Sequence, residues 1–123
     1  MNDEERQVLF IAQQVRLGAR GAMSTGQQLV GALLLGDTEW LKRIGYTIPD
    51  AIERIGSDCC AALSRVVRQL RNIDAAAWRE ATEGETDAER AARIKRARNG
   101  EDAPPARLED VWHAKVEALL AQP

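Results

Sequence analysis

The sequence has few aromatic residues, which make up only 4% of its 123 positions. Tyrosine and phenylalanine occur once each, whereas alanine and arginine are frequent. Sheet sandwiches and barrels depend on aromatic and β-branched side chains, so this composition argues against both. The length suits one domain with a real but modest core. We therefore expect a single, all-α domain.

An excess of either charge is also missing. Lysine and arginine together number 17 against 19 aspartates and glutamates, which gives a formal net charge of −2 at pH 7. Domains that bind nucleic acid through bulk positive charge usually carry a clear basic excess. Any contact with nucleic acid would therefore have to be local.

Long hydrophobic runs are absent as well. The longest one, LVGALLLG, is about a third of the length that a membrane span needs. The opening residues, MNDEER, are acidic, whereas a signal peptide opens with a basic stretch. We therefore expect a cytoplasmic protein that makes no contact with a membrane.

Cysteine and histidine are too scarce for the common metal and nucleophile sites. Cys59 and Cys60 are the only cysteines, and on a helix adjacent side chains diverge by roughly 100°, which would strain a disulfide. His113 is the only histidine, and no paired-carboxylate or nucleophile-elbow motif accompanies it. The sequence predicts no catalytic residue, no metal site and no cofactor, and hence a protein that is not an enzyme.

The clearest local signal is the start of a long central helix. Thr47 can cap it, Pro49 suits its first turn, and Asp50 completes a capping box. Apolar residues then recur at helical steps for about six turns. They are Ile52, Ile55, Cys59, Leu63, Val66, Leu70 and Ile73. This pattern predicts one helix over about 48–73.

Shorter helices are predicted before the central helix. The first starts at Asn2, the second near Ser24, and a two-turn helix covers the stretch DTEWLKRIG. Together with a helix at the end of the chain they form a bundle of four to five helices around the central one. Residues 1–80 are its helical core.

The stretch from 74 to 105 is almost free of large apolar residues, so it can bury little. We predict that 81–105 is a polar, partly mobile linker with a short basic helix, capped by Thr86 and ended at Asn99. The amphipathic helix of 106–123 then completes the core or reaches a second protomer in a dimer.

Three arginines, Arg65, Arg68 and Arg71, step by three along the predicted central helix. Guanidinium groups bind carboxylates and phosphates with paired hydrogen bonds, and no acidic residue lies between 59 and 73. These arginines are the preferred partner-binding surface. The alternative is an ordinary solvated helix flank whose arginines pair with acids from other helices.

A second basic group follows in the predicted linker. Its members are Arg90, Arg93, Lys95, Arg96 and Arg98. On a helix they would point in several directions, and acids flank them, so a solvated helix is the first interpretation. The alternative is a partner contact through Arg90, Arg93 and Arg96. Trp78 lies outside any strong apolar stripe and is the aromatic residue best suited to face a partner.

Taken together, these features predict a non-enzymatic helical interaction protein: an adaptor, an assembly subunit or an inhibitor that occludes a partner's surface. Small proteins of this style are typical accessory proteins of bacteriophages and other bacterial mobile elements, although no residue pattern supports that origin. The alternative is a small nucleic-acid-binding regulator or ribonucleoprotein subunit that uses the arginines of the central helix. We expect a protein partner rather than nucleic acid, and homo-oligomerisation stays open.

Overall fold

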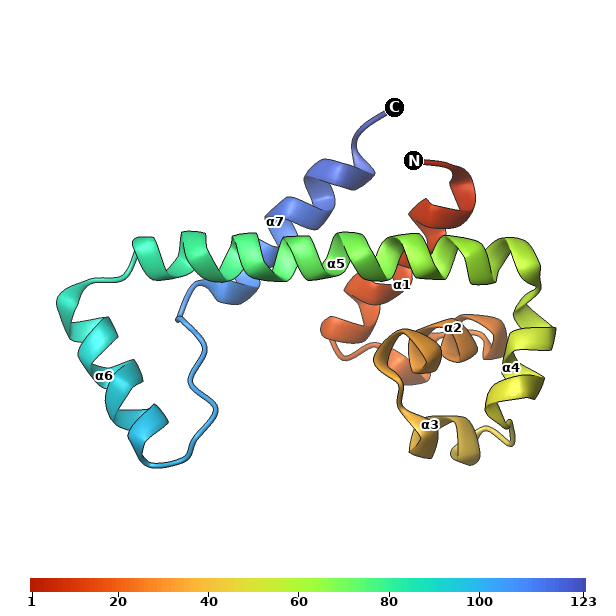
Figure 1. Cartoon of the computed structure of the whole chain (residues 1–123), viewed down its shortest axis with the longest axis horizontal. Coiled ribbons are helices and arrows are strands. Elements are labelled where there is room, and N and C mark those ends of the chain that lie inside the picture. Colours follow the sequence, from red (N-terminus) through yellow and green to blue (C-terminus); the bar gives the residue numbers. More distant parts are fainter. The chain divides into compact units, whose positions relative to one another are not determined.

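The computed structural model describes residues 1–123, and all of its regular secondary structure is helical, which confirms the predicted all-α fold (Figure 1). The elements are α1 (Asp3–Arg16), a 3₁₀ turn (Arg20–Ala22), α2 (Thr25–Leu35), α3 (Thr38–Arg43), α4 (Ile48–Ile55), α5 (Ser57–Glu83), α6 (Asp87–Arg98) and α7 (Leu108–Leu120). The chain divides into two compact units, Met1–Gln69 and Leu70–Pro123, and each is described by itself.

The long helix differs from its predicted bounds. The chain breaks at Gly56, whose φ of 86° and ψ of 166° lie in a region open almost only to glycine. The segment predicted as one helix over 48–73 is therefore α4 followed by the start of α5, which continues to Glu83. Ile52, assigned to the inner seam, is 47% exposed on α4.

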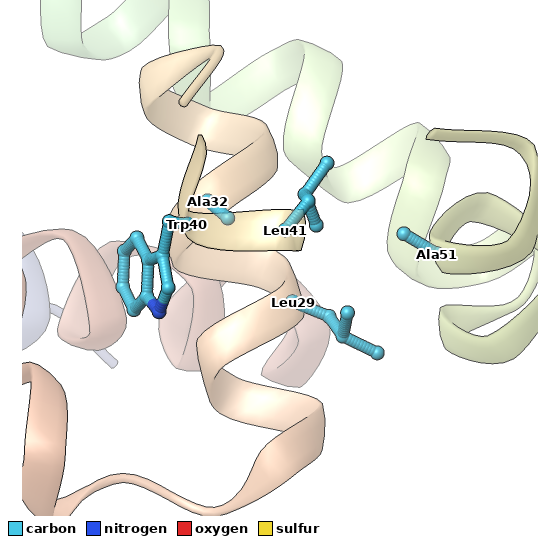
Figure 2. Close-up of a cluster of buried hydrophobic side chains, with 5 residues drawn as sticks. All are labelled: Leu29, Ala32, Trp40, Leu41 and Ala51. Carbon is cyan, nitrogen blue, oxygen red and sulfur yellow. The ribbon is translucent and has the colours of Figure 1, made fainter. Parts of the chain in front are cut away.

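Helix α2 is the centre of the first unit, because α1, α3 and α4 all pack against it. The buried cluster contains Leu29 and Ala32 of α2, Trp40 and Leu41 of α3, and Ala51 of α4 (Figure 2). Burying such side chains is the main favourable term in folding. This cluster thus lies around α2, and the long helix contributes Ala62 and Val66 to the buried residues of the unit.

The Trp40 side chain is fixed by polar contacts around its buried ring. Its indole N–H donates to the side-chain oxygen of Gln28 at 3.1 Å, and the Arg20 guanidinium stacks 4.5 Å from the ring centroid. Arg20 also pairs with Asp37 at 3.2 Å, while Asp37 caps α3 by accepting the Trp40 backbone N–H at 3.0 Å. The Trp40 N–H and the Arg20 guanidinium hold the pKa of the Asp37 carboxyl below its ordinary value.

This lowered pKa makes stability depend on pH. Because the folded state holds Asp37 ionised more strongly than the unfolded state does, its charge stabilises the fold above the unfolded pKa, and this contribution is lost as the pH falls through the folded value. We expect Asp37→Asn to lower the melting temperature at about pH 7, and the difference from the wild type to shrink by about pH 3. Thermal melts across this range test it, with the exposed Asp102→Asn as control. A pH-independent difference would contradict the prediction.

In the second unit, the last turns of α5 carry the buried residues Ile73, Ala77 and Ala81, and α7 carries the buried Trp112 and Val116. Two polar contacts join these helices. The Trp112 indole N–H donates to the Asp74 carboxylate at 2.7 Å, and Lys115 pairs with Glu80 at 2.7 Å. Asp74 and Glu80 are therefore engaged by α7, whereas Glu83, the last residue of α5, makes no ion pair.

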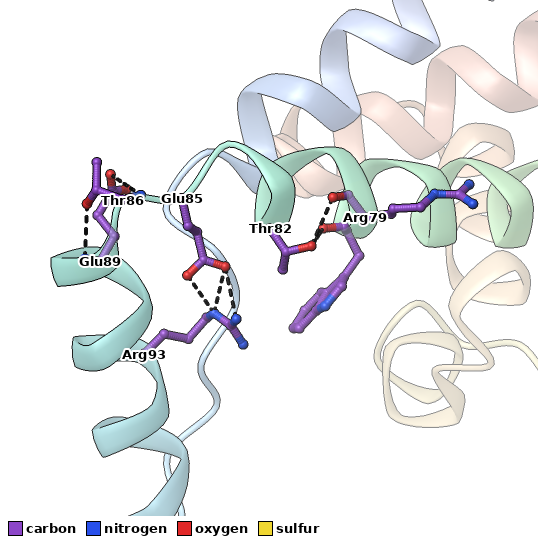
Figure 3. A network of polar contacts seen from close by, with 7 residues as sticks. Arg79, Thr82, Glu85, Thr86, Glu89 and Arg93 are labelled. Atoms are coloured by element: carbon purple, nitrogen blue, oxygen red, sulfur yellow. Dashed lines mark hydrogen bonds and ion pairs between the residues drawn. The ribbon is translucent and has the colours of Figure 1, made fainter.

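Helix α6 begins where the sequence predicted it. Thr86 accepts the backbone N–H of Glu89 at 3.1 Å, and the Glu89 side chain accepts the Thr86 N–H at 3.4 Å, which completes the capping box (Figure 3). The helix ends at Arg98, and the chain then runs without regular structure to α7 at Leu108, two residues after the predicted start at 106. No residue of α6 is buried.

Candidate functional site

The three arginines of the preferred surface are all exposed, but they do not form one row. Each step of three residues falls about 60° short of a full turn, so Arg65 and Arg71 lie about 120° apart around α5. Arg65 also pairs with Glu5 of α1 at 3.2 Å, and the Glu5 side chain is only 13% exposed. Arg65 thus fits the alternative of a solvated helix flank whose arginines pair with acids from other helices. Arg68 and Arg71, in contrast, make no ion pair.

Trp78 shares a flank of α5 with Arg71. Seven residues turn a helix by about 700°, so the two side chains lie within about 20° of each other. Trp78 is 42% exposed, and the small, exposed Ala75 lies between them. Arg79 follows directly, about 100° further around the helix, is exposed and makes no ion pair. We refer to Arg71, Ala75, Trp78 and Arg79 as the α5 flank, and all four belong to the second unit.

The α5 flank lies on a continuous helix. The Thr82 hydroxyl donates one turn back to the carbonyl oxygens of Trp78 and Arg79, at 2.9 Å each (Figure 3). Asp74 and Glu80, the acids nearest to the flank in sequence, are held by Trp112 and Lys115 of α7. Neither of them forms an ion pair with an arginine of the flank. Arg79 is the member of this surface that sequence reasoning missed, because no apolar spacing or charge run marks it.

Arg93, one of the candidate partner-binding residues, lies in an ion pair within the chain. Its guanidinium contacts both oxygens of Glu85 at 3.0 Å, with a further contact at 2.9 Å (Figure 3). The side chains of Arg93 and Glu85 are 20% and 2% exposed. Glu89, besides capping α6, lies 3.9 Å from Arg107. Of the acids that flank the basic run, Glu85 thus neutralises Arg93, a member of the run, whereas Glu89 is engaged by Arg107 outside it.

The other cations of the run are exposed and make no ion pair. They are Arg90, Lys95, Arg96 and Arg98. Arg90 lies one turn before Ile94, and Arg98 lies one turn after it. Because both steps are of four residues, the two arginines share one side of α6 with Ile94. Arg96 lies on a different side of the helix. The structure therefore separates Arg90 from the candidates Arg93 and Arg96 rather than bringing the three together.

The groups with chemical reactivity have no activating surroundings. Burial raises the pKa of the Cys59 thiol, and the Glu4 carboxylate and Cys60 raise it further, which disfavours a reactive thiolate. His113 lies 3.5 Å from Glu109 and packs edge-on against Trp112, with ring centroids 4.9 Å apart. No group of three or more histidine, cysteine, aspartate or glutamate side chains is placed to hold a metal ion.

Comparisons with protein families, with curated proteins and with solved structures find no match to this chain. None of its helices combines the length and the apolar character that crossing a membrane requires. The surfaces described above, and above all the α5 flank, are therefore the features of the chain that bear on its function.

Proposed function

We propose that this protein is a non-enzymatic interaction protein that binds an acidic surface of a partner protein through the α5 flank. The observation that carries the proposal is an exposed tryptophan on the same side of a regular helix as Arg71 and next in sequence to Arg79, two arginines that make no ion pair. The protein would act as an adaptor, an assembly subunit or an inhibitor that occludes the surface it binds.

The composition of the α5 flank supports a protein partner. Tryptophan and arginine are the residue types most enriched among those that dominate binding energy at protein interfaces. Ala75 adds little bulk between Arg71 and Trp78, so a partner side chain can approach the helix there. The backbone beneath is already helical, so binding need not order it, and this lowers the entropic cost of association.

Charge specifies the partner further. Arg71 and Arg79 would attract carboxylates and repel a basic surface, which favours an acidic partner. Phosphates satisfy guanidinium groups equally well, so a nucleic acid is the alternative occupant. The chain as a whole has a formal net charge of −2, and bulk attraction for a polyanion is therefore lacking.

Photo-crosslinking in cells that express the protein tests this proposal. A benzophenone amino acid replaces Trp78, and as a matched control it replaces Phe10, an aromatic residue of α1 that is 46% exposed. We expect a discrete crosslinked protein from position 78 and none from position 10. The crosslink should disappear in the R71E/R79E background and persist with R96Q. No crosslink at position 78, or one to nucleic acid, would overturn the proposal.

Once the crosslinked partner is identified, binding measurements with the purified proteins show how much the α5 flank contributes to affinity. We expect W78A and R71E/R79E each to raise Kd at least about tenfold. The effect of R71E/R79E should shrink as salt is raised, because screening weakens the charge contribution. Equal losses with R96Q would show that the effect is not specific to the α5 flank.

A further inference from the structure

A stripe of α6 is left without a partner inside the chain. Arg90, Ile94 and Arg98 follow each other at steps of four, and all three are exposed, with Ile94 at 41%. Of the acids near the stripe in sequence, Glu85 and Glu89 are engaged by Arg93 and Arg107, whereas Asp87, three residues before Arg90, is exposed and makes no ion pair. This α6 stripe is therefore an apolar side chain between two cations that make no ion pair.

The outer face of α7 has the opposite character. Its inner side buries Trp112 and Val116, and residues at steps of four and three run along the side turned away from them. They are Asp110, Ala114, Glu117 and Ala121, all of them exposed. Asp110 and Glu117 make no ion pair within the chain. This α7 face therefore carries two acids with the small Ala114 between them.

The two surfaces match in spacing as well as in charge. With a rise of 1.5 Å per residue, the arginines of the α6 stripe are about 12 Å apart along the helix, and the acids of the α7 face about 10 Å. Flexible arginine side chains cover that difference. If the helices run antiparallel, Ile94 lies opposite Ala114, where a small side chain leaves room for a large one. Arg98 then faces Asp110 at one end.

At the other end of the same antiparallel pair, Arg90 faces Glu117. The antiparallel direction also sets the positive end of one helix dipole beside the negative end of the other. Both surfaces belong to the second unit. Two copies can thus make the contact twice, α6 on α7 and α7 on α6, in a closed two-fold arrangement.

We propose that the α6 stripe of one copy binds the α7 face of a second copy, so that the chain forms a homodimer held by two such contacts. This inference is independent of the proposed function, because the α5 flank takes no part in it. Exposed ion pairs are individually weak, so the dimer is expected to dissociate at micromolar concentrations and at high salt.

A charge-swap experiment tests the proposal on the full chain by sedimentation velocity at low and high salt. One variant is R90E/R98E and the other is D110R/E117R. Alone, each variant sets like charges against each other at both contacts, so we expect Kd to rise at least about tenfold. Mixed in equal amounts, they restore opposite charges at both contacts, so dimers of near wild-type affinity should return. R96Q is the matched control and should dimerise like the wild type.

The recovery in the mixture also shows that both variants fold, and circular dichroism of each one confirms it. A wild type that stays monomeric at high micromolar concentration and low salt would overturn the proposal, as would dimers that survive both reversals. Assemblies larger than a dimer would overturn the closed two-fold arrangement. If the α6 stripe binds a single-stranded oligonucleotide and the chain does not self-associate, the stripe is a nucleic-acid-binding surface. That result would also overturn the dimer proposal.

Discussion

Arg93→Ala is expected to detach α6 from the rest of its unit. The Glu85 carboxylate is 2% exposed and depends on Arg93 for its countercharge, and removing one member of such a pair leaves a buried, uncompensated charge. Because 20% of the Arg93 side chain reaches solvent, we scale the usual cost down to about 2 kcal/mol. Since α6 buries no residue, the loss should appear as local opening.

Hydrogen exchange measures that opening directly. We expect the amides of α6 to exchange about thirtyfold faster in Arg93→Ala, which corresponds to about 2 kcal/mol, while the amides of α7 keep their protection. Arg96→Ala is the matched control, because Arg96 is an exposed arginine of the same helix without an ion pair, and it should change exchange little.

A second variant identifies the cause. In the Arg93→Ala background, Glu85→Gln removes the stranded charge, so it should recover part of the protection of α6. If Glu85→Gln instead slows nothing, or if Arg96→Ala exchanges as fast as Arg93→Ala, the ion pair is not what holds α6.

The contrast between Arg93 and Arg96 shows what the sequence could and could not predict. The capping boxes at Ser24 and at Thr86 are local patterns of four residues, and both were found where the sequence indicated a helix start. The Glu85–Arg93 pair spans a turn between two helices, so neither helical spacing nor charge counting identifies it. The five basic residues of the run therefore looked equivalent, although one of them is structural.

The long helix illustrates the same limit. The apolar spacing of three and four residues continues through Gly56. This spacing describes side chains only, so it gives no sign of the backbone angles that end the helix at one residue. The C-terminal end of the long helix was predicted too early for a different reason. After Ile73 its buried positions are alanines, Ala77 and Ala81, which carry little weight in a hydrophobic pattern. The all-α class survived both errors, because it depends on composition rather than on any single boundary.

The α5 flank was predicted in part. Trp78 was noted because it lay outside the apolar stripes, and the structure places it on an exposed side of a helix that the sequence ended too early. Because α5 continues to Glu83, Arg71 and Trp78 lie seven residues apart on one continuous helix. Arg79 lies on the same helix, next to Trp78 in sequence. The correct helix boundary is therefore what turns separate candidates into one surface.

Close approach between helices is the feature that the sequence concealed most fully, and Gly31 is where it has the largest consequence. A Cβ at Gly31 would lie 2.9 Å from Cη2 of Trp40 and 3.0 Å from Cγ2 of Val15. The Trp40 ring is held by Gln28 and Arg20 and cannot swing away without breaking those contacts. Gly31 is thus the point at which side chains of α1 and α3 reach the backbone of α2.

Gly31→Ala is expected to destabilise the first unit although alanine favours a helix. The gain in helix propensity is about 1 kcal/mol, whereas overpacking a rigid core costs about 1–3 kcal/mol, and the short distance to a fixed indole sets this case near the upper limit. A net loss of about 1–2 kcal/mol would lower the melting temperature by about 5–10 °C. Gly26→Ala on the same helix has nothing within 4 Å and should raise it slightly. In a Trp40→Phe background the smaller ring removes the clash, so the cost of Gly31→Ala should fall; an unchanged cost would show that Trp40 is not its origin.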